Sequence, residues 1–153
     1  MQKILVSACL LGCPVRYDGQ SKPAAHEHLH RLHARGWLVP FCPEQAGGLP
    51  TPRPAAEIQE DGRIMTACGQ DVTPPFLHGA EQALETCQRE RIQYAILKQS
   101  SPSCGSDNIY DGHFKQRKIP GEGMTCKLLR QHGITVYSED NLDELFSTLE
   151  PHL

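Results

Sequence analysis

Residues Lys3–Cys9 read KILVSAC, a nearly continuous apolar run close to the start of the chain. A run of this kind, without polar residues at alternate positions, is typical of a parallel strand buried on both faces. Three further stretches have the same character, at Trp37–Cys42, Gln93–Lys98 and Ile134–Tyr137. The sequence therefore predicts a mainly parallel sheet of about four strands.

Helical segments are expected between and after these strands. They lie at Pro23–Ala34, Thr73–Arg91, Gly121–His132 and Asn141–Leu149, and glycines 36 and 133 follow two of them as terminating residues. Alternating strands and helices predict an α/β fold, a three-layer Rossmann-like domain. The Asp61-Gly62 pair lies between two short strand-like arms in Ala56–Thr66, which adds a small β-hairpin.

The overall composition limits the partners. With 153 residues, the chain has the size of one domain, and we expect a single domain over residues 1–153. Its formal net charge of -3 offers no basic field for a phosphate backbone, so we expect no long nucleic acid as a partner. The N-terminal apolar run is too short to span a membrane and has no signal-peptide cleavage site. We expect a cytoplasmic protein with a small-molecule substrate and no membrane partner; the oligomeric state stays open.

The seven cysteines are a surplus for a cytoplasmic chain, where disulfides are rare. They are Cys9, Cys13, Cys42, Cys68, Cys87, Cys104 and Cys126. Cys9, Cys42 and Cys104 end or follow predicted strands, and ligands collect outside the carboxyl ends of parallel strands, so these three should meet. Cys13 shares the first loop and is a fourth candidate. The other three lie in predicted helices or after the hairpin and are expected to have packing roles.

Three converging thiols can bind zinc, hold an iron-sulfur cluster, or include one nucleophile, and their spacing alone does not choose among these. There is no C-x-x-C pair and no cysteine-histidine knuckle, so a zinc ribbon is poorly supported. Groups for acid-base chemistry lie in the same loops. Glu44 follows Cys42 by two residues, and the hydroxyls of Ser101 and Ser103 precede Cys104. These neighbours favour an active site over a structural metal clip.

Three blocks of the sequence, in order along the chain, carry a recognisable pattern. They are SACLLG at Ser7–Gly12 with VRYDG at Val15–Gly19, CPE at Cys42–Glu44 with GGLPTPR at Gly47–Arg53, and SPSCG at Ser101–Gly105, which Leu97-Lys98 precedes and IYDG at Ile109–Gly112 follows. In these blocks the chain resembles the bacterial 2-thiouracil desulfurases, a family long filed as a domain of unknown function. The resemblance covers essentially the whole chain.

The resemblance implies a 4Fe-4S cluster held by Cys9, Cys42 and Cys104, with a fourth iron open to the substrate sulfur. It implies a non-redox desulfuration of thiouracil, or a related thiolated pyrimidine, to uracil with release of hydrosulfide. Glu44 and Ser101 match the family's catalytic carboxylate and hydroxyl, which would assist the attack of water.

Three further residues are candidates for substrate binding. They are Arg16, Lys98 and Ser103. The two cations could stabilise developing negative charge, and the serine hydroxyl lies beside a presumed ligand.

Other functions stay open at this point. A non-catalytic cluster or zinc protein needs the same cysteines but neither Glu44 nor Ser101. A metal-free cysteine-persulfide sulfurtransferase needs a single reactive thiolate. The sequence does not determine the position of the thio group, the choice between free base and nucleoside, the acceptor of the sulfide, or whether Cys13 replaces Cys42 as a ligand.

Overall fold

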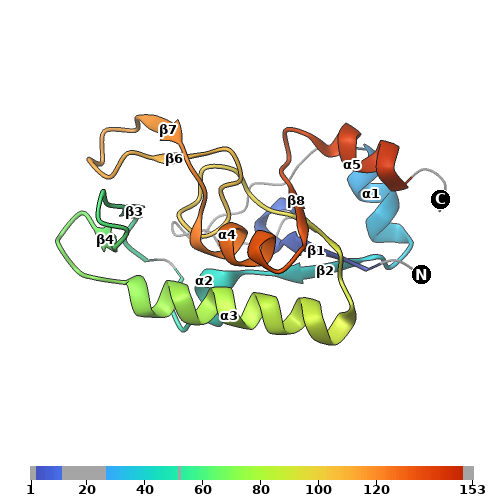
Figure 1. Cartoon of the computed structure of the whole chain (residues 1–153), viewed down its shortest axis with the longest axis horizontal. Helices are drawn as coiled ribbons and strands as arrows, with labels where there is room; N and C mark the ends of the chain where they lie inside the picture. The colour runs from blue at the N-terminus through green and yellow to red at the C-terminus, as the bar shows by residue number, and fades with distance from the viewer. Residues whose placement is uncertain (1–2, 12–26, 52, 150–153) are drawn as a thin grey trace.

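The computed structural model describes residues 3–11, 27–51 and 53–149. Four parallel strands form its central sheet in the order β2-β1-β5-β8 (Figure 1). They are β1 (Ile4–Ser7), β2 (Leu38–Phe41), β5 (Tyr94–Ile96) and β8 (Thr135–Tyr137). All four lie within the predicted stretches, so the predicted sheet and the α/β class are confirmed. The first strand is shorter than expected, because Ala8–Leu11 forms a 3-10 helix, η1.

Helices cover both faces of this sheet. They are α1 (Glu27–Ala34) and α5 (Leu142–Leu149) on one face, and α3 (Thr73–Glu90) and α4 (Met124–Gln131) on the other. Ile4 and Val6 pack into the core with α1 and α5, while Leu5 packs into a second core with α3 and α4. This alternation along β1 is why the strand is apolar at successive positions. The predicted start of the first helix, residues 23–26, lies outside the described residues.

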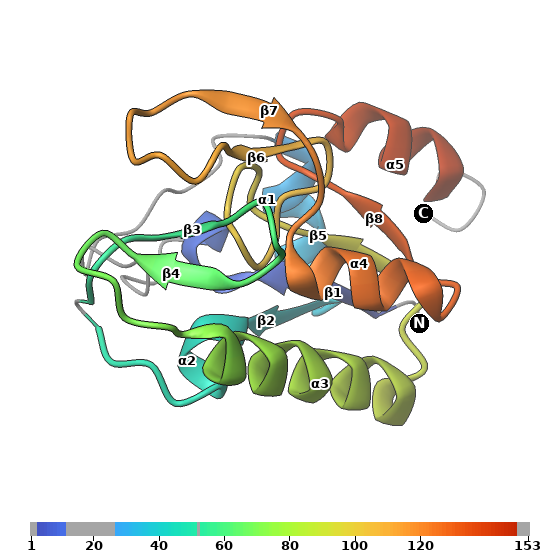
Figure 2. The ribbon, with the colours of Figure 1, turned by 60° about the vertical axis from the view of Figure 1, so that its left-hand side comes forward.

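Two antiparallel hairpins lie beyond the carboxyl ends of the sheet strands, at the end of the molecule away from α5 in Figure 1; Figure 2 shows one hairpin above the other. The first joins β3 (Ala56–Ile58) to β4 (Ile64–Thr66) through the predicted Asp61-Gly62 turn, in which Gly62 has a φ of 89°. The second joins β6 (Asn108–Tyr110) to β7 (Lys118–Pro120) and was not predicted.

A one-turn helix, α2 (Pro43–Ala46), follows β2 directly and was also not predicted. It packs against α3. None of the helices in the described ranges combines the length and the apolar character needed to cross a membrane.

Candidate active site

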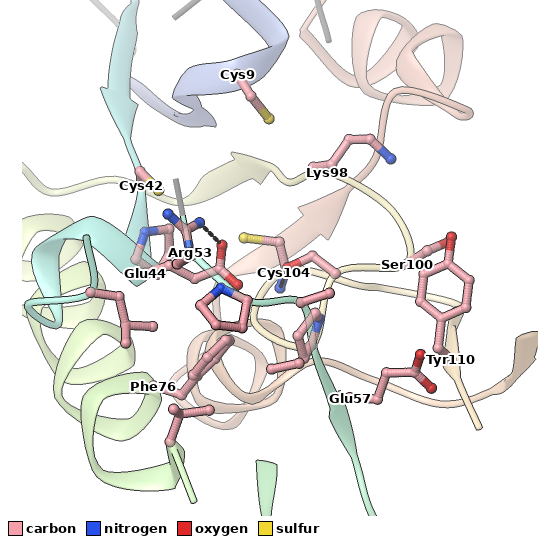
Figure 3. Close-up of a pocket in the computed structure, with 18 of the residues that line it drawn as sticks. Cys9, Cys42, Glu44, Arg53, Glu57, Phe76, Lys98, Ser100, Cys104 and Tyr110 are labelled. Atoms are coloured by element: carbon pink, nitrogen blue, oxygen red, sulfur yellow. Dashed lines mark hydrogen bonds and ion pairs between the residues drawn. The ribbon is translucent and has the colours of Figure 1, made fainter. Parts of the chain in front are cut away.

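A cavity of about 510 Å³ lies at the carboxyl ends of β1, β2 and β5 and extends between the two hairpins. Its wall contains the three predicted cysteine ligands, the two predicted catalytic residues and one predicted substrate-binding residue. They are Cys9, Cys42, Cys104, Glu44, Ser101 and Lys98. In Figure 3 the side chains of the three cysteines surround one space. The structure thus brings together residues that are up to 95 positions apart in the sequence, from 9 to 104.

Each cysteine is positioned by a different strand exit. Cys9 lies in η1 directly after β1, Cys42 is the residue before α2 at the end of β2, and Cys104 lies in the loop that follows β5. Since the three strands are parallel neighbours in the sheet, their carboxyl ends open to the same side.

The electrostatic environment opposes the ionisation of Cys104 and Cys42. Cys104 is only 4% exposed, and burial raises its pKa above the usual range for a thiol. Negative charge on Glu44, Cys42 or Cys9 raises that pKa further, whereas a hydrogen bond with Ser7 lowers it. Burial also raises the pKa of Cys42. The thiols are therefore close enough to oppose one another's ionisation, a conflict that a cationic metal centre removes.

The arrangement of the three thiols is compatible with a cluster. Among residues 3–11, 27–51 and 53–149, no three His, Cys, Asp or Glu side chains converge closely enough to hold one metal ion. In a cubane cluster each cysteine binds a different iron, so its ligands stand further apart than ligands of one zinc. Two buried thiols, those of Cys9 and Cys104, and the partly buried thiol of Cys42 line one open space, an arrangement that fits a cluster.

Glu44 lies in the cavity wall and forms an ion pair with Arg53, which is buried. The pair joins Arg53 Nη2 to Glu44 Oε2 (Figure 3). Arg53 Nη1 also donates to the carbonyl oxygen of Pro50 at 3.2 Å and to Thr51 Oγ1 at 3.0 Å. The guanidinium is therefore fixed by its own loop and holds the carboxylate in place.

Ser101 organises the loop that carries Cys104. Its Oγ accepts hydrogen bonds from the backbone N–H groups of Ser103 at 3.0 Å and Cys104 at 3.1 Å. These two hydrogen bonds occupy both lone pairs of the oxygen. The hydroxyl can therefore interact with a ligand by donating its proton in a hydrogen bond.

The three predicted substrate-binding residues have different positions. The Lys98 ammonium contacts Glu139 Oε2 at 3.0 Å and the carbonyl oxygen of Gln99 at 2.8 Å while its side chain lines the cavity. Ser103 is not among the lining residues, because it is 1% exposed and its hydroxyl pairs with Thr125 Oγ1 at 2.7 Å. Arg16 and Cys13 lie outside the described residues.

The remaining cysteines divide by burial. Cys87 and Cys126 are buried in the core under α3 and α4, as expected. Cys68 was expected to pack but is exposed after β4, where its sulfur lies 3.2 Å from Thr66 Oγ1.

Several residues that shape the site were not among the predicted site residues. Gln99 is 5% exposed, and its Oε1 accepts backbone N–H groups around the Cys104 loop. The donors are Ser100 at 3.3 Å, Ser106 at 3.0 Å, Asp107 at 3.0 Å and Asn108 at 3.2 Å. Glu57 and Tyr110, from the two hairpins, also line the cavity.

Comparison with known proteins gives consistent results. The sequence profile of the 2-thiouracil desulfurase family matches residues 4–141. The uncharacterized protein YbbK of Bacillus subtilis (strain 168) is 42% identical over 151 residues, which cover 93% of this chain and 99% of YbbK. The solved structure of the [4Fe-4S]-dependent thiouracil desulfidase TudS is 55% identical, with a TM-score of 0.95 over 98% of this chain and 99% of TudS.

Proposed function

The chain belongs to the 2-thiouracil desulfurase family, and from this membership we propose that it is a [4Fe-4S]-dependent enzyme that removes sulfur from a thiouracil. The products are uracil and hydrosulfide. The thiocarbonyl carbon gains a bond to the oxygen of water and loses its bond to sulfur, which leaves as hydrosulfide. Carbon and sulfur keep their oxidation states, so the reaction needs no electron donor.

The observation that supports this proposal best is the joint presence of three thiols, a carboxylate and a hydroxyl on one cavity wall. Cys9, Cys42 and Cys104 are the ligands that we propose for the cluster. When bound by only three cysteines, such a cluster supplies one iron that is open as a Lewis acid for a soft thiocarbonyl sulfur.

Glu44 is the base that we propose for the water. Arg53 engages its Oε2, whereas Oε1 has no hydrogen bond to any of the described residues. A carboxylate with one oxygen fixed and the other open can accept a proton from a water molecule held against the substrate carbon. The ion pair holds the open oxygen in one orientation. An unpaired carboxylate would instead rotate among several orientations.

Ser101 is the proposed proton donor or orienting group. Because its oxygen already accepts two backbone hydrogen bonds, the hydroxyl can act toward a ligand only by donating. A donor at this place would stabilise the oxygen or ring nitrogen that gains negative charge. The Lys98 ammonium, tied to Glu139, adds positive charge to the same wall.

The test is purification and reconstitution without oxygen, followed by iron, sulfide and turnover measurements. We expect about four iron and four sulfide per chain and conversion of thiouracil to uracil with release of sulfide. Cys9→Ser, Cys42→Ser and Cys104→Ser should each lose the iron. Cys87→Ser, which changes a buried thiol outside the cavity wall, should keep it.

Two results would favour the alternatives. Full turnover without iron, abolished by one cysteine variant alone, would favour a persulfide sulfurtransferase. A full cluster without turnover on any thiolated pyrimidine would favour a non-catalytic cluster protein. Cys68, Cys87, Cys104 and Cys126 carry free thiols, and a reducing cytoplasm is the compartment we propose for the chain.

A further inference from the structure

The cavity has a second end, which lies between the two hairpins. Glu57 of β3 and Tyr110 of β6 line this end. Figure 3 shows both on the opposite side of Cys104 from Cys9 and Cys42. This end is therefore remote from the three thiols but continuous with the same cavity.

Glu57 carries a carboxylate that is almost completely buried, since the residue is only 8% exposed. Its Oε1 accepts the backbone N–H of Gly112 at 2.9 Å and that of Phe114 at 3.3 Å. Within residues 3–11, 27–51 and 53–149, its Oε2 has no hydrogen-bond donor and no cation. A buried carboxylate oxygen without a partner is costly, and natural proteins keep such groups where a ligand completes them.

We propose that Glu57 Oε2 is the acceptor for a hydrogen-bond donor of the substrate, which makes the hairpin end of the cavity a recognition subsite. The inference rests on the proposed function, because the ligand is the thiolated pyrimidine that the cysteine end activates. With the thiocarbonyl at the cysteines, an N–H or O–H group on the far side of the substrate points toward Glu57. An acceptor there selects substrates that carry such a donor and fixes their orientation.

A purely structural role is the competing explanation. Glu57 belongs to the first hairpin and accepts a hydrogen bond from the backbone N–H of Gly112 in the second. The carbonyl oxygen of Gly112 in turn accepts a hydrogen bond from Gln59 Nε2 at 3.1 Å, so these contacts join the two hairpins. That role uses only Oε1. The two roles therefore belong to different oxygens of one carboxylate and can be separated by a single substitution.

Glu57→Gln is the separating variant. The amide oxygen is expected to take the place of Oε1, because the backbone N–H groups of Gly112 and Phe114 require an acceptor there. The amide nitrogen then replaces Oε2 and turns an acceptor into a donor of nearly the same shape. Glu60→Gln is the matched control, because it makes the same change of charge on an exposed residue of the same hairpin turn.

The experiment measures kcat and KM of the cluster-loaded variants on 2-thiouracil, with iron content and melting temperature as checks of the fold. We expect Glu57→Gln to keep its iron and melting temperature and to raise KM about ten- to hundred-fold, the loss typical of a hydrogen bond to a charged group. Glu60→Gln should match the wild type. An unchanged KM in Glu57→Gln would overturn the proposal.

The substrate donor can be a ring N–H or a hydroxyl of a substituent on the base, and substrate variants separate the two. If Glu57→Gln raises the KM for free thiouracil, and this rise disappears when the ring N–H is methylated, the donor is the ring N–H. If Glu57→Gln raises KM only for a thionucleoside, the donor is the hydroxyl. If Glu57→Gln lost its iron, the wild-type KM values for the same substrates would test the proposal instead. A wild-type KM that does not change when any of these donors is removed would overturn it. Absence of all turnover in the loaded wild type would instead contradict the proposed function.

Discussion

Arg53 and Glu44 form an ion pair inside the cavity wall, with side chains that are 4% and 18% exposed. The two residues are nine positions apart, with Glu44 in α2 and Arg53 in the segment that follows it, where the guanidinium also donates hydrogen bonds to Pro50 and Thr51. Arg53 is therefore a positioning residue for the proposed base, and its fork geometry determines where the open carboxylate oxygen points.

Arg53→Met should keep the cluster but lower kcat at least about ten-fold, because Glu44 loses the partner that orients it. Removing one member of a buried pair should also lower the free energy of unfolding by about 3 kcal/mol. Steady-state kinetics, iron content and urea denaturation measure these effects. Arg53→Lys restores the charge but not the two-pronged geometry, so it should recover stability more than kcat.

Arg63→Met provides the control for this prediction. Arg63 pairs with Asp61 at 2.7 Å, but both side chains are more than half exposed, at 58% and 52%. Exposed pairs of this kind contribute less than about 1 kcal/mol. A normal kcat in Arg53→Met would show that Glu44 needs no orientation by Arg53.

A close contact between α2 and α3 sets the position of Cys42 and Glu44. A Cβ atom on Gly79 of α3 would lie 1.8 Å from the carbonyl oxygen of Pro43, and one on Gly47 would lie 1.9 Å from that of Pro75. Neither contact is possible, so the two helices can approach this closely only with glycine at both places.

Gly79→Ala should therefore destabilise the protein, although alanine is the better helix former. Moving α2 away from α3 displaces Cys42 and Glu44 together, so we expect less iron per chain and a lower kcat in the remaining loaded fraction. Leu77→Ala, on an exposed position of the same helix, should change neither quantity. A Gly79→Ala protein with full iron content would show that α2 adapts to the added methyl group.

The sheet and most of the site could be predicted because both depend on patterns that the sequence carries directly. Buried parallel strands leave continuous apolar runs, and the Asp61-Gly62 pair specifies a tight turn. Cys9, Cys42 and Cys104 were expected to meet because each lies at a strand exit, and parallel strands open to one side. The structure places all three on the same cavity wall.

Other parts of the site left no such pattern. The three residues of β7 are all exposed, so the second hairpin shows no alternation of buried and exposed positions. Its turn uses Phe114 and Gln116 at φ values of 58° and 59°, where glycine or asparagine would have given a turn signal. Ser103 lies one position from Cys104 yet points into the core, and proximity in sequence does not say which way a loop residue faces.

The two serines near Cys104 should behave differently when the hydroxyl is removed. Ser101→Ala removes the acceptor for two backbone N–H groups and the donor that faces the cavity, so we expect a large loss of kcat and some loss of iron. Ser101→Thr keeps the hydroxyl and should retain the iron. Ser103→Ala should lower stability by about 1–3 kcal/mol, because Thr125 is left buried and unpaired, with KM unchanged. A raised KM in Ser103→Ala would assign that hydroxyl to the substrate instead.

Stability should fall at alkaline pH, in part because of Cys87. Burial raises the pKa of Cys87 from 9.0 to about 11. The folded chain therefore holds this proton while the unfolded chain releases it, so unfolding becomes easier as the pH rises from about 9 to about 11. The stability difference between wild type and Cys87→Ala should shrink with pH over that window, by at most about 1.4 kcal/mol per pH unit. Urea denaturation of both proteins at several pH values measures it.

Cys68 provides the comparison for Cys87, because its thiol is exposed and a hydrogen bond from Thr66 lowers its pKa. A lowered pKa in the folded state has the opposite sign: its contribution to stability is present above the unfolded pKa and is lost as the pH falls. The difference between wild type and Cys68→Ala should therefore not shrink between pH 9 and 11. If the difference between wild type and Cys87→Ala also stayed constant over this range, the Cys87 thiol would ionise in the folded protein as easily as in the unfolded chain, and its burial would carry no electrostatic cost.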